Sequence, residues 1–225
     1  MSLMQHLVEL RNVLIKSVVA LLIGTILAAI VTPQILQFLI APYGTTLQTI
    51  DPTENISIYL RVSIMAGAVS AMPIFVYLLW TFIAPGLENQ EKRYVRIVVP
   101  GATILFLIGV GFAWSIMLPA AIGFLSTFQS EIFKSDWRAD DYIPFVTSLM
   151  FWIGVSFEMP LMVFFLAKLK LVTAGLLLKG WRFAVVGIAV IAAVITPTVD
   201  PFNMLLVMAP LILLYFFSIL LAKLA

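Results

Sequence analysis

Six long apolar runs constrain the fold of this chain more than any other feature of its sequence. We place them roughly at residues 13–32, 62–84, 97–120, 143–167, 183–196 and 203–222. A helix needs about 20 apolar residues to cross the hydrocarbon core of a bilayer. The mean hydropathy of +1.13 and the 11% of charged residues lie far outside the range of soluble domains. The sequence therefore predicts an all-α polytopic membrane protein in which residues 1–225 form a single membrane domain.

Basic residues predict the orientation of these spans, because Lys and Arg are enriched in cytoplasmic loops. If the N-terminus is cytoplasmic, ten basic residues lie on the cytoplasmic side: Arg11, Lys16, Lys92, Arg93, Arg96, Lys168, Lys170, Lys179, Arg182 and Lys223. Three lie on the opposite side: Arg61, Lys134 and Arg138. The first run continues past the length of a signal peptide without a small-residue cleavage site, so we expect a retained anchor. The sequence thus predicts a multi-pass protein of the cytoplasmic (inner) membrane with both termini in the cytoplasm.

Short and proline-interrupted spans predict a cupped bundle of kinked helices. The fifth run is apolar only from Phe183 to Ile195, 13 residues. As a helix it would be about 20 Å long against a hydrocarbon core of ~30 Å, which predicts a thinned bilayer or shielding by neighbouring helices. Prolines lie within or beside the spans, and each removes a backbone donor and tends to kink its helix: Pro73, Pro100, Pro119, Pro160 and Pro210.

Two predicted outer loops, residues 33–57 and 121–142, are long for a small bundle. Both are polar enough to fold over the outer face. They are either ordinary linkers or a packed cap that holds the helix ends apart, and the sequence leaves both interpretations open.

Composition and motifs argue against enzymatic chemistry and against a nucleic-acid partner. The chain has no cysteine, and its one histidine, His6, lies outside the spans, so no imidazole is available for acid–base chemistry inside the membrane. P-loop and H-E-x-x-H motifs are missing, and so is a pair of intramembrane aspartates. The net charge of +2 is too small to indicate nucleic-acid binding. We therefore expect no catalytic residues, no cofactor and no metal.

The segment HLVELR (6–11) combines an apolar stripe with two polar side chains. The stripe recurs at spacings of three and four, as on a helix in the membrane interface: Leu3, Leu7, Leu10 and Leu14. His6 and Glu9 are three residues apart, so both can point toward the cytoplasm from a neighbouring face. Taken alone, Glu9 is best explained as a solvated acid near a helix N-terminus.

The segment PGLENQEKR (85–93) carries two further acids on the predicted cytoplasmic side. Glu88 and Glu91 fall in the first turns after a Pro-Gly helix end, where the helix dipole favours acids. Lys92 and Arg93 follow directly, so a local ion pair explains Glu91 at least as well as a binding role. Glu88 is the weaker site candidate of the two.

Glu158, in FWIGVSFEMP (151–160), is the one acid that the sequence places within a span. A charged group at the bilayer centre costs at least ~2.5–3.5 kcal/mol, so such a group normally faces protein or trapped water. One interpretation is a protonated side chain bonded to helix backbone that Pro160 leaves unpaired. The interpretation we prefer is a polar patch that receives another membrane helix or a translocated segment.

Four segments together resemble the TatC family, the core subunits of the twin-arginine protein translocase: HLVELR, YLLWTFIAPGLENQEKR (77–93), FWIGVSFEMP and ITPTVDPFNMLLVMAPLILLY (195–215). The resemblance implies six transmembrane helices in a glove-like bundle, with shortened helices five and six. It implies recognition of the twin-arginine signal peptide of folded precursor proteins and assembly with TatA- and TatB-type single-span proteins, driven by the proton-motive force. The protein is further expected to contact membrane lipid and to associate with itself in a larger complex.

The resemblance also implies roles for individual residues. The signal-peptide site would contain Glu9 and Glu91, with His6, Arg11, Phe82 and Arg93 around them. Glu158 and Pro160 would receive the partner helices, and Pro42 and Asp200 would be structural residues of the outer loops. A planar guanidinium can bind a carboxylate through two hydrogen bonds, which lysine cannot match, so paired acids suit a twin-arginine motif.

This chain departs from the family pattern at two positions. Val13 replaces a frequent second arginine after ELR, and Phe216 replaces an acid that many relatives carry after the LLY tyrosine. A small proton-coupled permease that uses Glu158 is the main alternative function, but we find no inverted repeat and no paired polar groups. An intramembrane hydrolase is a weaker alternative, because the catalytic residues are missing.

Overall fold

The computed structural model describes residues 3–83, 92–132, 136–196 and 200–225; the side chains of Leu3, Ile83 and residues 92–97 lie outside this description. Within it, the helices are α1 (Leu3–Ile40), α2 (Glu54–Ile83), α3 (Lys92–Phe112), the π-helical turn η2 (Ala113–Met117), α4 (Leu118–Thr127), α5 (Ala139–Phe157), α6 (Met159–Lys168), α7 (Ala174–Ile195) and α8 (Pro201–Leu224). The described residues form six spans long and apolar enough to cross a membrane and no strand, since α3, η2 and α4 form one span and α5 and α6 another. The predicted all-α, six-span fold is confirmed.

The chain divides into two compact units that interleave along the sequence. One contains Met1–Ile40 and Thr49–Ile104, and the other contains Ala41–Gln48 and Leu105–Ala225. The chain therefore passes between the units after Ile40, after Gln48 and within α3.

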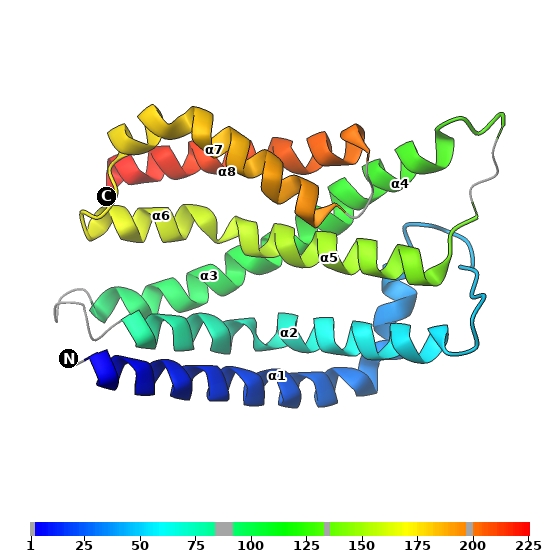
Figure 1. Ribbon diagram of the computed structural model, residues 1–225, viewed down its shortest axis with the longest axis horizontal. Coiled ribbons are helices and arrows are strands. Elements are labelled where there is room, and N and C mark those ends of the chain that lie inside the picture. Colours follow the sequence, from blue (N-terminus) through cyan, green and yellow to red (C-terminus); the bar gives the residue numbers. More distant parts are fainter. Residues whose placement is uncertain (1–2, 84–91, 133–135, 197–199) are drawn as a thin grey trace. The chain divides into compact units, whose positions relative to one another are not determined.

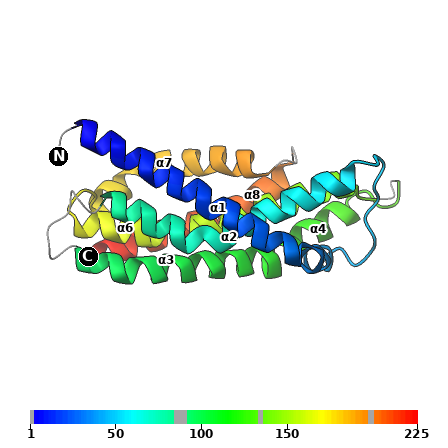
Figure 2. The same cartoon turned by 90° about the horizontal axis from the view of Figure 1, so that it is seen from below.

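In the first unit, α1 and α2 form an antiparallel hairpin whose helices cross at close range (Figure 1 and Figure 2). Small residues four apart are buried along α1: Ala20, Gly24, Ala28 and Thr32. A Cβ on Gly24 would lie 2.7 Å from the carbonyl oxygen of Gly67 on α2, and a Cβ on Gly67 would lie 2.5 Å from the backbone nitrogen of Thr25. Because no Cβ fits at either position, the two backbones can approach more closely than larger side chains would allow.

The first helix does not end where the sequence predicts a loop. Residues 33–40 continue α1, with Pro33 inside the helix, so the outer loop begins at Ala41. Figure 1 shows α1 changing direction near its C-terminal end. Pro33 has no N–H to donate to the carbonyl oxygen of Ala29, and the Tyr59 hydroxyl of α2 donates to that oxygen instead. The helix therefore bends here without ending.

In the second unit, α5 forms the centre of the core. Side chains recurring every three or four residues along it are almost fully buried: Tyr142, Ile143, Val146, Leu149 and Ile153. Helix α8 packs against both α6 and α7 (Figure 1). The Tyr215 hydroxyl of α8 donates a hydrogen bond of 2.7 Å to the carbonyl oxygen of Leu177 in α7.

Parts of the two loops that the sequence predicts to be outer pack against each other in this unit. The backbone nitrogen of Gln48 donates to the carbonyl oxygen of Trp137 at 3.1 Å, and that of Ala139 donates to the carbonyl oxygen of Gln48 at 2.8 Å. The rings of Tyr43 and Trp137 lie 6.0 Å apart and those of Tyr43 and Tyr142 lie 5.6 Å apart, between centroids. Between the packed-cap and linker interpretations, residues 41–48 and 136–142 therefore favour the cap.

The fifth span is longer as a helix than its apolar run predicts. Helix α7 begins at Ala174, nine residues before Phe183, with the Thr173 side chain accepting a bond from the Leu176 nitrogen at 3.2 Å. Hydropathy missed these turns because Lys179 and Arg182 lie in them. The whole helix has 22 residues, about 33 Å at the usual rise, and is long and apolar enough to cross a hydrocarbon core of ~30 Å. Bilayer thinning stays a prediction.

Candidate functional site

The end of the hairpin at which α1 begins and α2 ends brings together two of the predicted site residues. The two helices run antiparallel, so the first turns of α1 lie beside the last turn of α2 (Figure 1). The rings of His6 and Phe82 are stacked there, with centroids 4.3 Å apart and an interplanar angle of 26°. His6 is exposed and Phe82 is half-buried, so the pair presents an aromatic surface at this end of the hairpin.

Glu9 lies about one turn from His6 on the same helix and is half-buried. Its Oε2 atom is buried and has no hydrogen-bond partner within the described part of the chain. A buried acceptor without a partner is uncommon in a folded protein. The side chain is therefore suited to accept a donor that this part of the chain does not supply. Arg11 lies exposed on the following turn.

The predicted interfacial segment is continuous with the first span and not a separate helix. Helix α1 has 38 residues, about 57 Å at the usual rise and well beyond a hydrocarbon core of ~30 Å. Its ends must therefore extend past the hydrocarbon, where charged groups are solvated. The stripe leucines in the described part, Leu7, Leu10 and Leu14, are exposed.

Two further predicted site residues cannot be placed against this surface. Glu91, like Glu88, lies outside the described residues. Arg93 is in the first turn of α3, but its side chain is among those not described.

Glu158 lies at a break between two helices of the fourth span. Helix α5 ends at Phe157 and α6 begins at Met159, with Pro160 in the first turn of α6. Because Pro160 has no backbone N–H, the bond that a regular helix would make to the carbonyl oxygen of Ser156 is missing at this point. The Glu158 side chain is half-buried, and its Oε1 atom is buried without a hydrogen-bond partner in the described ranges. The break thus places a carboxylate with unused acceptor capacity inside an apolar span.

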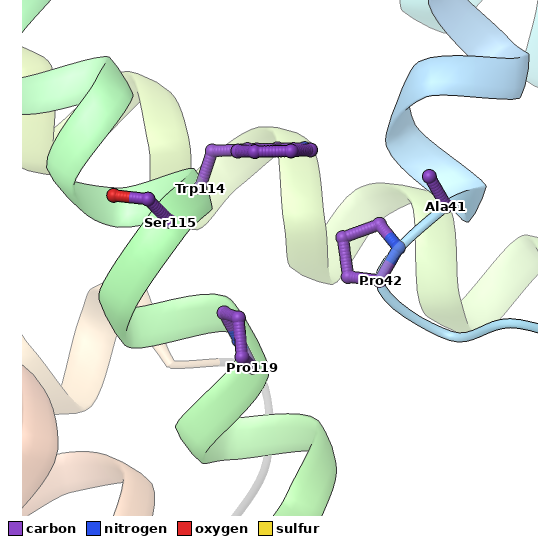
Figure 3. Close-up of a pocket in the computed structure, with 5 residues that line it drawn as sticks. All are labelled: Ala41, Pro42, Trp114, Ser115 and Pro119. Atoms are coloured by element: carbon purple, nitrogen blue, oxygen red, sulfur yellow. The ribbon is translucent and has the colours of Figure 1, made fainter.

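Pro42 lines a pocket of about 240 Å³ in the second unit, together with Ala41, Trp114, Ser115 and Pro119. Figure 3 shows the Trp114 and Pro42 rings facing this space. Trp114 and Ser115 belong to the π-helical turn η2, and Pro119 follows it. This pocket cannot be predicted from the sequence, because neither the π-helical turn nor the approach of Pro42 has a sequence pattern.

Asp200 caps the N-terminus of α8. Its Oδ1 atom accepts a bond of 2.7 Å from the backbone nitrogen of Asn203, and its Oδ2 atom accepts one of 2.9 Å from Asn203 Nδ2. Asn203 is only 1% exposed, so the cap also serves a buried amide. The T-x-D-P-x-N order around it is a helix-start signal that could have been read from the sequence.

The described residues hold no group of three or more His, Asp or Glu side chains that could bind a metal ion. What they do contain is six membrane-spanning helices, an aromatic pair beside a half-buried acid, and a lone carboxylate at a helix break. These features define an all-helical, polytopic membrane protein.

Comparisons with known proteins identify the family. Residues 5–210 match the family described as Sec-independent protein translocase protein (TatC). The chain is 38% identical over 223 residues to the TatC protein of Helicobacter pylori strain 26695, covering 97% of this chain and 86% of that protein. It is 34% identical over 217 residues to the TatC protein of Synechocystis, covering 96% and 85%. The chain belongs to the TatC family.

A solved structure agrees with this assignment. The crystal structure titled as the twin-arginine translocase receptor TatC superposes with a TM-score of 0.88 at 36% identity, covering 97% of this chain and 98% of that one. The protein is therefore a multi-pass membrane subunit of a Sec-independent (Tat) protein translocase, a transport component and not a catalytic enzyme. This assignment favours the translocase interpretation over the permease.

Proposed function

We propose that this protein binds the twin-arginine signal peptide of folded precursor proteins at the end of the α1–α2 hairpin. The observation that carries the proposal is the juxtaposition of the His6–Phe82 stack with Glu9, whose Oε2 atom is buried without a partner in the described part of the chain. A guanidinium can stack on an aromatic ring and donate two hydrogen bonds to one carboxylate. The name of the related crystal structure, a twin-arginine translocase receptor, supports the same role.

The remaining parts of the proposal follow from the resemblance and the charge pattern. Glu91, from the segment between α2 and α3, and Arg93, from the first turn of α3, complete the site, and Arg11 adds a basic side chain beside Glu9. The site faces the cytoplasm, with both chain termini on that side of the inner membrane. TatA- and TatB-type single-span proteins join the complex at the Glu158–Pro160 break, and the proton-motive force drives export.

Peptide binding to the full-length protein in detergent tests the proposal. We expect a labelled peptide with an Arg-Arg pair to bind and its Lys-Lys analogue to bind much more weakly. Glu9→Gln should weaken binding of the Arg-Arg peptide by roughly 10- to 150-fold, because a hydrogen bond to a charged group contributes about 1.5–3 kcal/mol.

Glu131→Gln is the matched control, since it removes an exposed carboxylate in a predicted outer loop. It should leave peptide binding unchanged. Equal binding of the two peptides by the wild-type protein, or equal effects of Glu9→Gln and Glu131→Gln, would contradict the proposal.

A further inference from the structure

We propose that Pro33 is a hinge in α1 and that the Tyr59 hydroxyl of α2 is the latch that holds it. The inference concerns how the first helix is shaped and is independent of the peptide site. All the residues that carry it belong to the first compact unit.

The hinge arises from one missing donor. In a regular α-helix the N–H of residue 33 would donate to the carbonyl oxygen of Ala29, and proline has no N–H to give. The Ala29 carbonyl lies within the first span, where an unsatisfied backbone group costs several kcal/mol. Pro33 lies seven residues before Ile40, the last residue of α1, and α1 changes direction near that end (Figure 1).

The latch is the donor that replaces it. The hydroxyl of Tyr59, on the adjacent helix, donates to the carbonyl oxygen of Ala29. Tyr59 is half-buried, and its bond to Ala29 joins α2 to α1 at the carbonyl group that Pro33 leaves without a helical donor. To straighten or swing the segment after Pro33, this bond must break and leave the carbonyl unsatisfied.

A second set of contacts, at Thr32 and Ser63, also joins the two helices beside this bond. The Thr32 hydroxyl contacts the carbonyl oxygen of Ala28 at 2.9 Å and the Ser63 hydroxyl at 2.8 Å, and the Ser63 hydroxyl contacts the carbonyl oxygen of Tyr59 at 2.8 Å. Thr32 and Ser63 have one hydroxyl proton each, whereas the three contacts need three protons. One of the three contacts is therefore always without a hydrogen bond. Thr32 is fully buried and Ser63 is 1% exposed, so water does not supply the missing donor easily. Protons can move between these positions without displacing the helices.

The segment that the latch controls is residues 34–40, the end of α1. It leads directly into Ala41 and Pro42 of the outer loop. A released latch would let this segment change direction while residues 3–32 stay packed on α2 through Gly24 and Gly67.

Hydrogen exchange of the full-length protein in detergent, with and without Pro33, tests the inference. We expect Tyr59→Phe to speed amide exchange of residues 34–40 by about 2- to 10-fold, the factor that corresponds to one net hydrogen bond. In the Pro33→Ala variant the backbone N–H of residue 33 can donate to the carbonyl oxygen of Ala29. Adding Tyr59→Phe to this variant should therefore change the amide exchange of residues 34–40 very little. Pro33→Ala alone should slow the exchange of residues 34–40, which tests the hinge without touching Tyr59.

Tyr77→Phe is the matched control, because Tyr77 is an exposed tyrosine on the same helix. It should leave exchange of residues 34–40 unchanged. The inference is overturned if Tyr59→Phe has the same effect with and without Pro33, if it has no effect, or if it speeds exchange equally along residues 10–28.

Discussion

Prolines inside the spans each leave one carbonyl oxygen without its helical donor, and this protein meets the deficit in three ways. At Pro33 a tyrosine of the neighbouring helix supplies the donor. Ahead of Pro119 the chain widens into a π-helical turn, in which the Leu118 nitrogen donates to the carbonyl oxygen of Ala113. At Pro160 the helix ends and restarts around Glu158. The same residue type therefore gives a bend, a pocket wall and an acidic break.

The acidic break predicts a specific pattern of partner binding. Glu158→Gln keeps two polar atoms at the break, whereas Glu158→Leu removes them. We expect TatA- and TatB-type partners to copurify with the Gln variant at close to wild-type levels and to be largely lost with the Leu variant. Ser156→Ala is the control, because the Ser156 hydroxyl already donates within its helix to Trp152 at 2.7 Å. Full copurification with the Leu variant would show that the polarity of this position is not used.

The cap at Asp200 predicts a stability effect. Asp200→Ala removes the acceptor for the Asn203 nitrogen and for its buried amide, so the protein should lose about 1–2 kcal/mol of unfolding free energy. Asp200→Asn should recover most of it. Thr173→Ala removes an exposed cap with a longer contact of 3.2 Å and should cost less. Thermal unfolding in detergent compares the three variants, and an equal loss in both alanine variants would refute the special role of Asp200.

Whether the neighbours of a residue can be predicted from the sequence depends on how far apart in the chain the contacting residues are. His6 and Glu9 are three apart on one helix, so their neighbourhood follows from helical periodicity alone. The stack of His6 on Phe82 joins residues that are far apart in the chain, and periodicity says nothing about it. The Tyr59 donor was missed for the same reason, since Pro33 had been assigned to a loop.

At the scale of helices, the α1–α2 hairpin depends on close backbone contact. Its two glycines are Gly24 and Gly67. A Cβ atom added to either glycine would lie less than 3 Å from a backbone atom of the other helix. The spacing of four between small residues on α1 is present in the sequence. The sequence does not show that this face is buried, because the uniformly apolar composition gives no amphipathic signal.

Adding a methyl group at this contact should separate the helices. Gly67→Ala would place its Cβ 2.5 Å from the Thr25 nitrogen, a backbone atom that cannot move aside alone. We expect a loss of about 1–3 kcal/mol, because overpacking outweighs the gain in helix propensity. Gly123→Ala is the control, since nothing lies within 4 Å of its added Cβ, and it should be neutral or slightly stabilising. Thermal unfolding of both variants decides the point; equal stability would contradict the packing argument.

Helix boundaries were predicted well where polarity changes sharply and poorly elsewhere. Segment 203–222 lies within α8, which Asp200 starts. Helix α7 begins nine residues before the predicted apolar run, because two basic side chains in its first turns lower the local hydropathy to the level of a loop. The first helix extends to Ile40, beyond the predicted start of the loop at residue 33, and Pro33 lies inside it.

For the molecule as a whole, the orientation in the membrane is the largest remaining prediction. The chain contains no cysteine, so single cysteines can be introduced without removing any. Thr46→Cys, in the outer cap, should react with a membrane-impermeant maleimide in intact cells. Lys223→Cys should react only after the membrane is opened, because ten basic residues favour a cytoplasmic C-terminus. The opposite labelling pattern would overturn the orientation and the cytoplasmic site with it.

The interleaving of the two units has a consequence for biosynthesis. Residues 41–48 leave the ribosome early but belong to the unit that otherwise starts at Leu105. At about 5–20 residues per second, this segment waits roughly 4–18 s until Trp137, the backbone partner of Gln48, has been made. During that interval, the loop that contains Tyr43 and Gln48 is anchored by α1 and α2, the two helices that flank it. A nascent chain arrested near residue 100 should accordingly carry a loop that proteases cut and that the finished protein protects.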